Sequence, residues 1–325
     1  MLSSVFCEYF GLTPRFNSAI EAGGATGAIQ IMHAAALIRS GMCRHVLCVT
    51  GDNRLTGMTR DRAVAALAGV GHAQFEQPYG ISVPAAYALV AQRYMHEYGA
   101  TSDQLAAIAV SHRNHAALHP NSHYTEPITI EDVMNSRIIA SPLHIFDCCP
   151  VSDGGAAVIV SEGNLSADMR KPPVAILGMG QGHTHEHITE APSLTDFGCK
   201  NSSRQAFEEA GVSPFDIDVA EIYDSFTITL LVELESIGFF KRGEAGLAAL
   251  QGELTFGGKL PCNTHGGLLS YGHSGAAGGA FHVVEAVRQL RGEAEGRQIE
   301  EANLVFVHGD GGVLSAHCSM VLGRF

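Results

Sequence analysis

The sequence predicts an α/β protein made of two related units, the first of which carries a long insertion. Each unit has the same plan: a glycine-rich loop enters an apolar helix, an apolar strand follows, and a Gly/Asp turn leads to another strand. The first copy spans roughly residues 21–160 and the second roughly residues 173–325. An internal duplication of this kind packs two α/β units together, so both helix N-termini would point at one central site.

The second glycine-rich loop, residues 263–279, is the segment around which the candidate site is built. It reads NTHGGLLSYGHSGAAGG and leads into an apolar segment with helical spacing, residues 280–290. Glycines let the backbone turn sharply and approach a ligand closely, and a helix N-terminus offers free N–H groups. Tyr271 and His273 would lie at the mouth of this loop. The same pattern also fits a packing turn in which His273 caps the helix.

The first unit begins in the same way and then departs from it. The glycine-rich segment 21–28 leads into an apolar helix that is expected to be buried on all sides. Residues 45–50 predict a central buried strand. Residues 54–145 contain helical pieces at 84–98 and 102–115 between polar, proline-containing loops, which indicates an insertion. The other expected strands are 156–160, 174–177, 218–227, 303–307 and 317–322, and the other expected helices are 201–210 and 228–237.

The composition limits the functions that the chain could have. A formal net charge of −13 argues against nucleic acid, which rewards clustered Lys and Arg. Eight scattered cysteines without a zinc-type pair indicate free thiols in a reducing compartment, so we expect a cytoplasmic protein. The opening residues carry no secretory signal pattern, and no apolar run approaches the length of about eighteen residues that a membrane span needs.

Five motifs carry a resemblance to a known family: GGATGA at 23–28, CPVSDGGAAVIV at 149–160, EIYDSF at 221–226, NTHGGLLSYGHSGAAGG at 263–279 and HGDGG at 308–312. Their order and spacing resemble the thiolase superfamily, specifically its sterol-carrier-protein-type thiolases and their bacterial relatives. The resemblance implies a five-layer α/β/α/β/α fold built from two related halves, with an inserted loop domain that contacts acyl-CoA. The implied boundaries are 1–52 and 153–170 for the N-terminal half, 53–152 for the loop domain and 171–325 for the C-terminal half. The N-terminal half is expected to be truncated at its start.

The chain also departs from the family's catalytic pattern. Gly24 occupies the position of the nucleophilic Cys, the turn 308–312 lacks the family's second Cys, and Tyr223 stands at the place of an oxyanion-hole residue. Only His273 remains of the four usual catalytic groups. Without the thiol, ordinary thiolysis through an acyl-enzyme is not expected. The combination resembles the thiolase-like aldolases of bacterial steroid side-chain degradation, which cleave a β-hydroxyacyl-CoA into a ketone and a shorter acyl-CoA.

This resemblance gives each candidate residue an expected role. Tyr223 and Tyr271 are the acid/base and donor candidates, and His273 is the donor to an oxyanion or enolate. The expected substrate-binding residues are Gly24, Asn263, Gly275 and Gly311. Tyr223 could instead be a strand-end core residue, and Tyr271 could be an exposed loop residue.

Two other functions remain open at this point. One is an acyltransferase of the acetyl-CoA acetyltransferase or thiolase type that uses another nucleophile. The other is a non-catalytic acyl-CoA-binding or lipid-transfer-associated protein. The resemblance also implies a homodimer, with a small OB-fold/zinc-ribbon protein as a possible partner, and no cofactor beyond the coenzyme A of the substrate.

Histidine clusters and basic residues give weaker signals. His112, His115 and His119 with His123 nearby, and His183, His185 and His187, have spacings that could bind a metal. The sequence favours a solvated helix face for the first set and a loop near the site for the second, so no metal is expected. Arg54, Arg60 and Arg62 could meet the anionic end of coenzyme A or could be surface charges.

Overall fold

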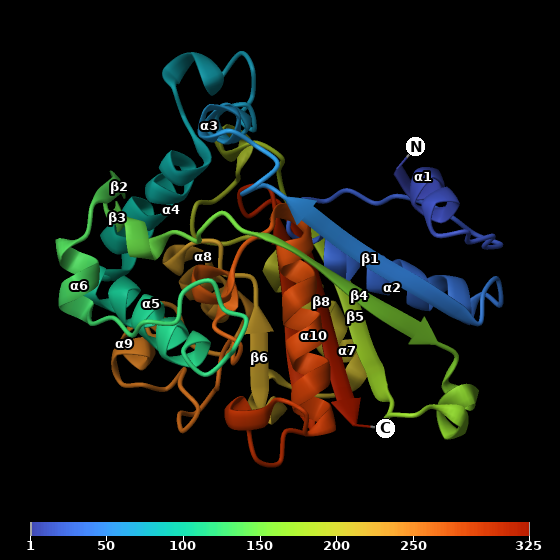
Figure 1. Ribbon diagram of the computed structural model, residues 1–325. Coiled ribbons are helices and arrows are strands. Elements are labelled where there is room, and N and C mark those ends of the chain that lie inside the picture. The colour runs from blue at the N-terminus through green and yellow to red at the C-terminus, as the bar shows by residue number, and fades with distance from the viewer. Residues whose placement is uncertain (1, 325) are drawn as a thin grey trace.

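Two sheets with a pair of helices between them organise the chain (Figure 1). The computed structural model describes residues 2–324, without the side chains of residues 60, 63, 64 and 166–168. The smaller sheet pairs β1 (His45–Asn53) with β4 (Asp153–Ser161) in antiparallel register. The larger sheet has the strand order β5–β8–β7–β6, and these strands are β5 (Val174–His183), β6 (Val219–Ile222), β7 (Leu304–Gly311) and β8 (Ala316–Arg324). The α/β class is confirmed.

The helices α2 (Thr26–Arg39) and α10 (Gly278–Arg291) lie between the two sheets, and α7 (Cys199–Ala210) covers the other face of the larger one. The starts of α2 and α10 touch. A Cβ atom on Gly27 would lie 2.7 Å from the backbone N of Ala280, so only glycine permits this approach. The expectation that the two helix N-termini meet at one place is therefore confirmed.

Strand β1 is not the central buried strand that its apolar sequence predicted. It belongs to a two-stranded sheet and alternates between buried and exposed residues. One face packs against α2 and α10, whereas on the other face Leu47 is 48% exposed and Ile159 is 66% exposed. A short apolar run in a sequence does not show whether one or both faces of the strand are covered. The prediction of a central buried strand was therefore wrong for β1. Helix α2 is likewise buried on one side only, and its His33 is exposed.

The segment between β1 and β4 is mostly helical and lies on the left in Figure 1. It packs against α8 (Thr227–Ile237) and α9 (Ala245–Leu250) of the C-terminal half. A buried hydrogen bond of 2.6 Å from Tyr94 Oη to Glu235 Oε1 ties the two parts together. The elements of the segment are α3 (Arg60–Ala68), α4 (Val83–Tyr98), α5 (Ser102–Ala116), α6 (Ile130–Asn135), β2 (Ile138–Ala140) and β3 (Leu143–His144). Helix α1 (Leu2–Tyr9) precedes the whole arrangement.

His112 and His115 of α5, and His119 shortly after its end, do not form the solvated face that the sequence favoured. His112, His115 and His119 are 0%, 1% and 3% exposed. Helix α5 is covered by α6, α8, α9 and the turn at 267–271, so its polar side chains on those sides are shielded from solvent. His112 Nδ1 lies 2.9 Å from Asp224 Oδ2, and His115 Nδ1 lies 3.2 Å from the carbonyl of Asn263.

The structure was also searched for membrane-spanning helices. Within residues 2–324, no helix combines the length and the apolar character needed to cross a bilayer.

Candidate active site

A phenol and an imidazole face each other where the C-terminal half meets α2. Tyr223 follows the last residue of β6, and His273 comes from the glycine-rich loop before α10. Tyr223 Oη and His273 Nε2 are 2.7 Å apart, a short hydrogen bond. Tyr223 is 5% exposed, whereas His273 remains partly open to solvent. The two expected catalytic groups are therefore in direct contact.

The surroundings keep both members of this pair uncharged. Burial raises the pKa of Tyr223 well above its usual value, and the nearby Cys149 and Asp310 act in the same direction. Burial, followed by the positive charge of Arg54, lowers the pKa of His273 to about 4. At neutral pH the pair is thus a neutral phenol and a neutral imidazole that share one hydrogen bond, and either atom can hold its proton.

Gly24 gives the phenol its place. An ideal Cβ on Gly24 would overlap the ring of Tyr223 and the carbonyl oxygen of Asp310. Any side chain at position 24 would therefore require the tyrosine to move. Only the hydrogen atom of a glycine fits at position 24, and this lets the ring of Tyr223 pack directly against the backbone there.

Asn263 acts on the position of Tyr223 rather than facing open space. It is fully buried, and its backbone has a positive φ of 52°. Its Nδ2 donates to the carbonyl of Ile222 and its Oδ1 accepts from the N–H of Ile222, both at 2.7 Å. The side-chain amide thus pairs with the end of β6 as a neighbouring strand would, and both its polar groups are used. The structure places Asn263 behind the pair.

The two remaining glycines mark close backbone approaches. Gly275 has a positive φ of 62°, and a Cβ there would meet Arg54 and Asp52. A Cβ on Gly311 would overlap the carbonyl of Ala22. Both glycines are buried, and their contact with a substrate stays a prediction.

Arg54 is the one expected basic residue with a defined place beside the pair. Its Nε lies 2.8 Å from Asp52 Oδ2, and its charge contributes to the lowered pKa of His273. Its side chain is 40% exposed, so it could still meet an anionic group. Arg62 is exposed, and the side chain of Arg60 lies outside the described part of the chain.

Tyr271 joins a different group of rings. Its ring centroid lies 4.7 Å from His119, 5.2 Å from His265 and 5.3 Å from Phe281. Burial raises its pKa as well. Tyr271 is partly exposed, but its ring neighbours are not those of Tyr223. The structure therefore brings together two of the three expected catalytic rings and places the third in a neighbouring cluster.

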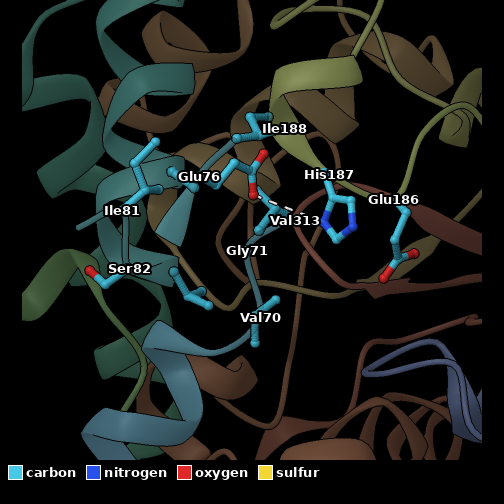
Figure 2. Close-up of a pocket in the computed structure, with 11 residues that line it drawn as sticks. Val70, Gly71, Glu76, Ile81, Ser82, Glu186, His187, Ile188 and Val313 are labelled. Carbon is cyan, nitrogen blue, oxygen red and sulfur yellow. Dashed lines mark ion pairs between the residues drawn. The ribbon is translucent and has the colours of Figure 1, made fainter. Parts of the chain in front are cut away.

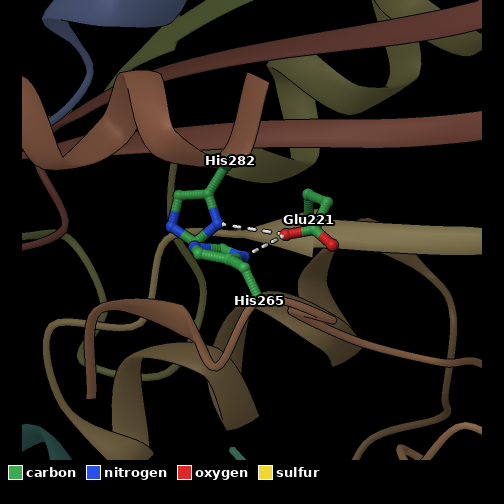
Figure 3. A group of neighbouring side chains, drawn as sticks. All are labelled: Glu221, His265 and His282. Atoms are coloured by element: carbon green, nitrogen blue, oxygen red, sulfur yellow. Dashed lines mark ion pairs between the residues drawn. The ribbon is translucent and has the colours of Figure 1, made fainter. Parts of the chain in front are cut away.

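Glu221, His265 and His282 form a buried carboxylate–imidazole cluster (Figure 3). Glu221 Oε2 lies 3.0 Å from His265 Nδ1 and 3.5 Å from His282 Nδ1, and all three residues are buried. Burial raises the pKa of Glu221, but the two imidazoles outweigh it and hold that pKa well below its usual range. Because the ring of His282 lies 6.2 Å from that of Tyr223, the cluster borders the Tyr223–His273 pair. Sequence reasoning missed it because its members are far apart in the chain, although Glu221 lies in the EIYDSF motif.

Cys149 is a second group that sequence reasoning missed. Its N–H donates to the carbonyl of Ser225, two residues after Tyr223, at 3.0 Å. Burial raises the pKa of Cys149 well above its usual value, so the group is a thiol at neutral pH. The signal was its position at the start of the CPVSDGG motif.

A small cavity of about 20 Å³ lies between the insertion and the loop after β5 (Figure 2). Glu76 and His187 face each other across it, with Nδ1 and Oε2 3.9 Å apart. Glu76 also accepts hydrogen bonds from the N–H and hydroxyl of Thr189. His185 instead donates to the carbonyl of Val313, so the expected histidine set does not converge on one point. Neither Tyr223 nor His273 lines this cavity.

Two glycine-led helices that meet at a phenol–imidazole pair, with a helical insertion between the strands of the smaller sheet, define an α/β enzyme of the thiolase-like class. Residues 180–324 match a family described as "Thiolase C-terminal domain-like". The chain is 33% identical to the acetyl-CoA acetyltransferase of Methanothermobacter thermautotrophicus, over 97% of this chain and 83% of that one. It is 35% identical to the steroid side-chain-cleaving aldolase of Thermomonospora curvata, over 91% of this chain and 78% of that one.

A solved structure adds to this similarity. The structure of the Ltp2-ChsH2(DUF35) aldolase matches with a TM-score of 0.82 and 36% identity, over 93% of this chain and 78% of that one. The chain belongs to the thiolase superfamily, within its sterol-carrier-protein-type branch, and it is related to the aldolases that cleave steroid side chains. As an enzyme it falls among the aldolases or acetyltransferases of that superfamily.

Proposed function

We propose that the protein cleaves a carbon–carbon bond of a β-hydroxyacyl-CoA by a retro-aldol reaction, without an acyl-enzyme intermediate. The observation that carries the proposal is the place of Tyr223. Its ring fills the space into which a side chain at position 24 would project, and its hydroxyl lies 2.7 Å from His273. The 35% identity to a steroid side-chain-cleaving aldolase supports the same chemistry.

The reaction requires a group that takes up one proton and later returns it. The β-hydroxyl proton passes to Tyr223 Oη while the phenol gives its own proton to His273 Nε2. The Cα–Cβ bond then breaks: its electron pair forms the thioester enolate, and the β-carbon becomes the carbonyl of a ketone. Return of the proton from the pair to Cα gives the shorter acyl-CoA. A buried imidazole whose pKa is lowered to about 4 returns a proton readily.

The same hydrogen bond can stabilise the enolate in its other arrangement. When His273 donates its Nε2–H to the phenol oxygen, Tyr223 is free to donate its own proton to the enolate oxygen. Such donors lower the barrier most in a site from which water is excluded, and Tyr223 is 5% exposed. This arrangement retains the expected role of His273 as an enolate donor, acting through Tyr223.

We assign Tyr271 a supporting role. Its ring packs against His119 and His265, and His265 in turn contacts His282 beside Tyr223. Through this chain of rings Tyr271 would help to hold the cluster that borders the pair. Removal of its hydroxyl should therefore cost less than removal of the Tyr223 hydroxyl.

We propose a bulky acyl-CoA as the substrate, with the segment 53–152 contributing to its binding and Gly24, Gly275 and Gly311 forming the close backbone wall. The aldolase relative is named for steroid side chains, which supports a steroid acyl group. Arg54 lies beside the pair and is partly exposed, so it is our candidate for an anionic part of coenzyme A.

We also propose a small DUF35-type partner protein and a homodimer. Similarity to the solved Ltp2-ChsH2(DUF35) aldolase supports the first of these. Co-expression with a DUF35 protein, followed by size-exclusion chromatography with light scattering, tests both. A monomer that never co-elutes with the partner would contradict them.

The reaction is tested with a panel of steroid and aliphatic β-hydroxyacyl-CoAs, by following ketone release. We expect release of a ketone and a shorter acyl-CoA in equal amounts, and its loss in Tyr223→Phe. Turnover that is unchanged in Tyr223→Phe would remove the mechanism.

Cys149 supports a second candidate function, an acyltransferase with this thiol as the nucleophile. Its proximity to Tyr223 favours the idea, and its raised pKa opposes it. Intact-mass measurement after exposure to acyl-CoA decides between the two. An acyl adduct on the wild type that is absent in Cys149→Ala would replace the aldolase by an acyltransferase.

A further inference from the structure

A second buried cluster of acids and imidazoles lies where α8 packs on β7 and β8. Its position follows from strand register. His308 and Asp310 lie two residues apart on β7, so they share one face of the sheet, and in the neighbouring strand Asp310 pairs with His317. Helix α8 contributes one carboxylate, Glu233, to this face. The α8–β7–β8 cluster consists of Glu233, His308, Asp310 and His317, all 0% exposed.

Three ligand atoms of this cluster, one each from Glu233, His308 and His317, lie within 4.8 Å of one another. His308 Nε2 lies 3.1 Å from His317 Nδ1 and 3.4 Å from Glu233 Oε1. His317 Nδ1 lies 3.8 Å from Glu233 Oε1 and 3.8 Å from Asp310 Oδ1. Both carboxylate oxygens of Glu233, and Oδ1 of Asp310, lack a hydrogen-bond partner among the described residues. Unpaired carboxylate oxygens in a fully buried place are costly, so they point to a missing positive charge.

The other ring nitrogens show which atoms carry protons. His317 Nε2 lies 2.9 Å from the carbonyl of Leu314, which can only accept, so Nε2 carries the hydrogen and Nδ1 is bare in the neutral ring. His308 Nδ1 lies 2.9 Å from Ser319 Oγ. The hydroxyl of Ser202 donates to the carbonyl of Cys199, so Ser319 donates to Ser202 and accepts from His308. His308 Nε2 is therefore bare as well.

Two bare imidazole nitrogens thus face each other at 3.1 Å, with two unpaired carboxylate oxygens beside them. Four acceptors with no donor between them repel one another. The outer nitrogens are fixed by a carbonyl and a hydroxyl, which is the arrangement that orients histidines as metal ligands. Tyr87 Oη holds the remaining oxygen of Asp310 at 3.1 Å.

We propose that the α8–β7–β8 cluster binds one structural Zn²⁺ ion. Zinc takes imidazole nitrogen and carboxylate oxygen at about 2.0–2.2 Å in a tetrahedron, which places neighbouring ligand atoms about 3.3–3.6 Å apart. The separations among Glu233 Oε1, His308 Nε2 and His317 Nδ1 are 3.1–3.8 Å and bracket this value, so these three residues would supply ligands. The Asp310 carboxylate, 3.8 Å from His317 Nδ1, adds a second negative charge beside the ion. Calcium and magnesium prefer oxygen ligands, so they suit the site less well.

The cation would join α8 to the end of β7 that borders the Tyr223–His273 pair. The Asp310 side chain lies beside His317, while its carbonyl oxygen lies against Gly24. Zinc binding at this cluster does not depend on which reaction the Tyr223–His273 pair performs.

The test measures metal in untagged full-length protein grown with zinc. We expect about one zinc per chain by elemental mass spectrometry, and its loss in Glu233→Gln and His317→Gln. Glu221→Gln, in the other buried cluster, is the matched control and should retain the metal. A metal that stays in the first two variants but leaves in the control would overturn the proposal.

A second measurement uses the wild-type protein, so that the proposal can still be tested if the variants do not fold. Wild-type protein is stripped with a chelator and titrated with Zn²⁺ or Co²⁺. Zinc should raise the melting temperature by roughly 5 °C or more, because it binds only the folded state. Cobalt should give tetrahedral visible bands without the near-ultraviolet charge transfer of a thiolate ligand. Protein that carries no metal and shows no zinc-dependent shift, or thiolate charge transfer from one of the cysteines, would overturn the proposal.

Discussion

Tyr223 follows strand β6 and Tyr271 lies in the glycine-rich loop before α10, and the surroundings of the two tyrosines differ. Tyr223 follows directly on β6 and faces His273 at 2.7 Å. Tyr271 ends a tight turn and packs against His119, His265 and Phe281. A strand end fixes the direction of the next side chain, whereas a turn lets its residue point elsewhere. Two phenols that motifs place near one site therefore need not share its chemistry.

The largest effect is expected for Tyr223→Phe. The substitution keeps the ring beside Gly24 but removes the hydroxyl that bonds to His273. We expect kcat to fall by roughly 10²–10⁴, the usual contribution of a general acid–base group. Steady-state ketone release measures it, with circular dichroism as the control for folding. A loss smaller than that of Tyr271→Phe would reverse the comparison.

Gly24→Ala should have the next largest effect. Its methyl group would overlap the ring of Tyr223, so the phenol must leave its place beside His273. Overpacking of this kind costs about 1–3 kcal/mol of stability. We expect kcat to fall by about 10²-fold if the displaced phenol loses most of its contribution. Gly257→Ala, at a glycine with open space around it, is the matched control. Full activity in Gly24→Ala would show that the place of the phenol is unimportant.

Tyr271→Phe should have a smaller effect, below about tenfold in kcat. The ring contacts with His119 and His265 survive in phenylalanine, and only the hydroxyl is lost. Aromatic contacts of this kind contribute about 0.5–1.5 kcal/mol, so Tyr271→Ala should be the more damaging change. Kinetics and thermal melting of the two variants separate a chemical role from a packing role. A thousandfold loss in Tyr271→Phe would give this residue the acid/base role that the sequence suggested.

The smallest effect is expected from pH. The pKa of His273 lies at about 4, and both phenols have raised pKa values, so none of these groups titrates near neutrality. We expect a flat kcat between about pH 5 and pH 9. Stability behaves differently: the unfolded chain takes up a proton at His273 between about pH 6.5 and pH 4, while the folded chain does not. Stability should therefore fall as the pH falls through this window, and His273→Gln should weaken that dependence in urea titrations. An inflection of kcat near pH 6.5 would contradict the assignment.

Much of the fold could be predicted because glycine-rich loops and apolar periodicity are local signals. The helices expected at 84–98 and 280–290 correspond to α4 and α10, and the strand expected at 303–307 corresponds to β7. The burial of β1 and of the α5 histidines could not be predicted in this way. Whether a strand or helix face is covered depends on elements far away in the chain, and residue type alone does not report it.

The candidate site could be predicted where both contacting residues lie in recognisable sequence motifs. Tyr223 and His273 lie in two such motifs, and the structure brings them together. The α8–β7–β8 cluster was beyond reach, although the HGDGG motif already contains His308 and Asp310. Its other members depend on the register of β7 with β8 and on the packing of α8, which only coordinates supply.

A side chain at position 24 and the ring of Tyr223 would occupy the same space. A side chain at position 24 would overlap both the ring of Tyr223 and the backbone carbonyl oxygen of Asp310, so it requires the ring to move and the backbone at residue 310 to shift. A chain that changed from a thiol at position 24 to a phenol at position 223, or back, would have to exchange both residues together, because each single exchange leaves either a clash or a hole. The two substitutions should therefore be non-additive when they are combined, and removal of the tyrosine alone leaves the overlap with the Asp310 carbonyl in place.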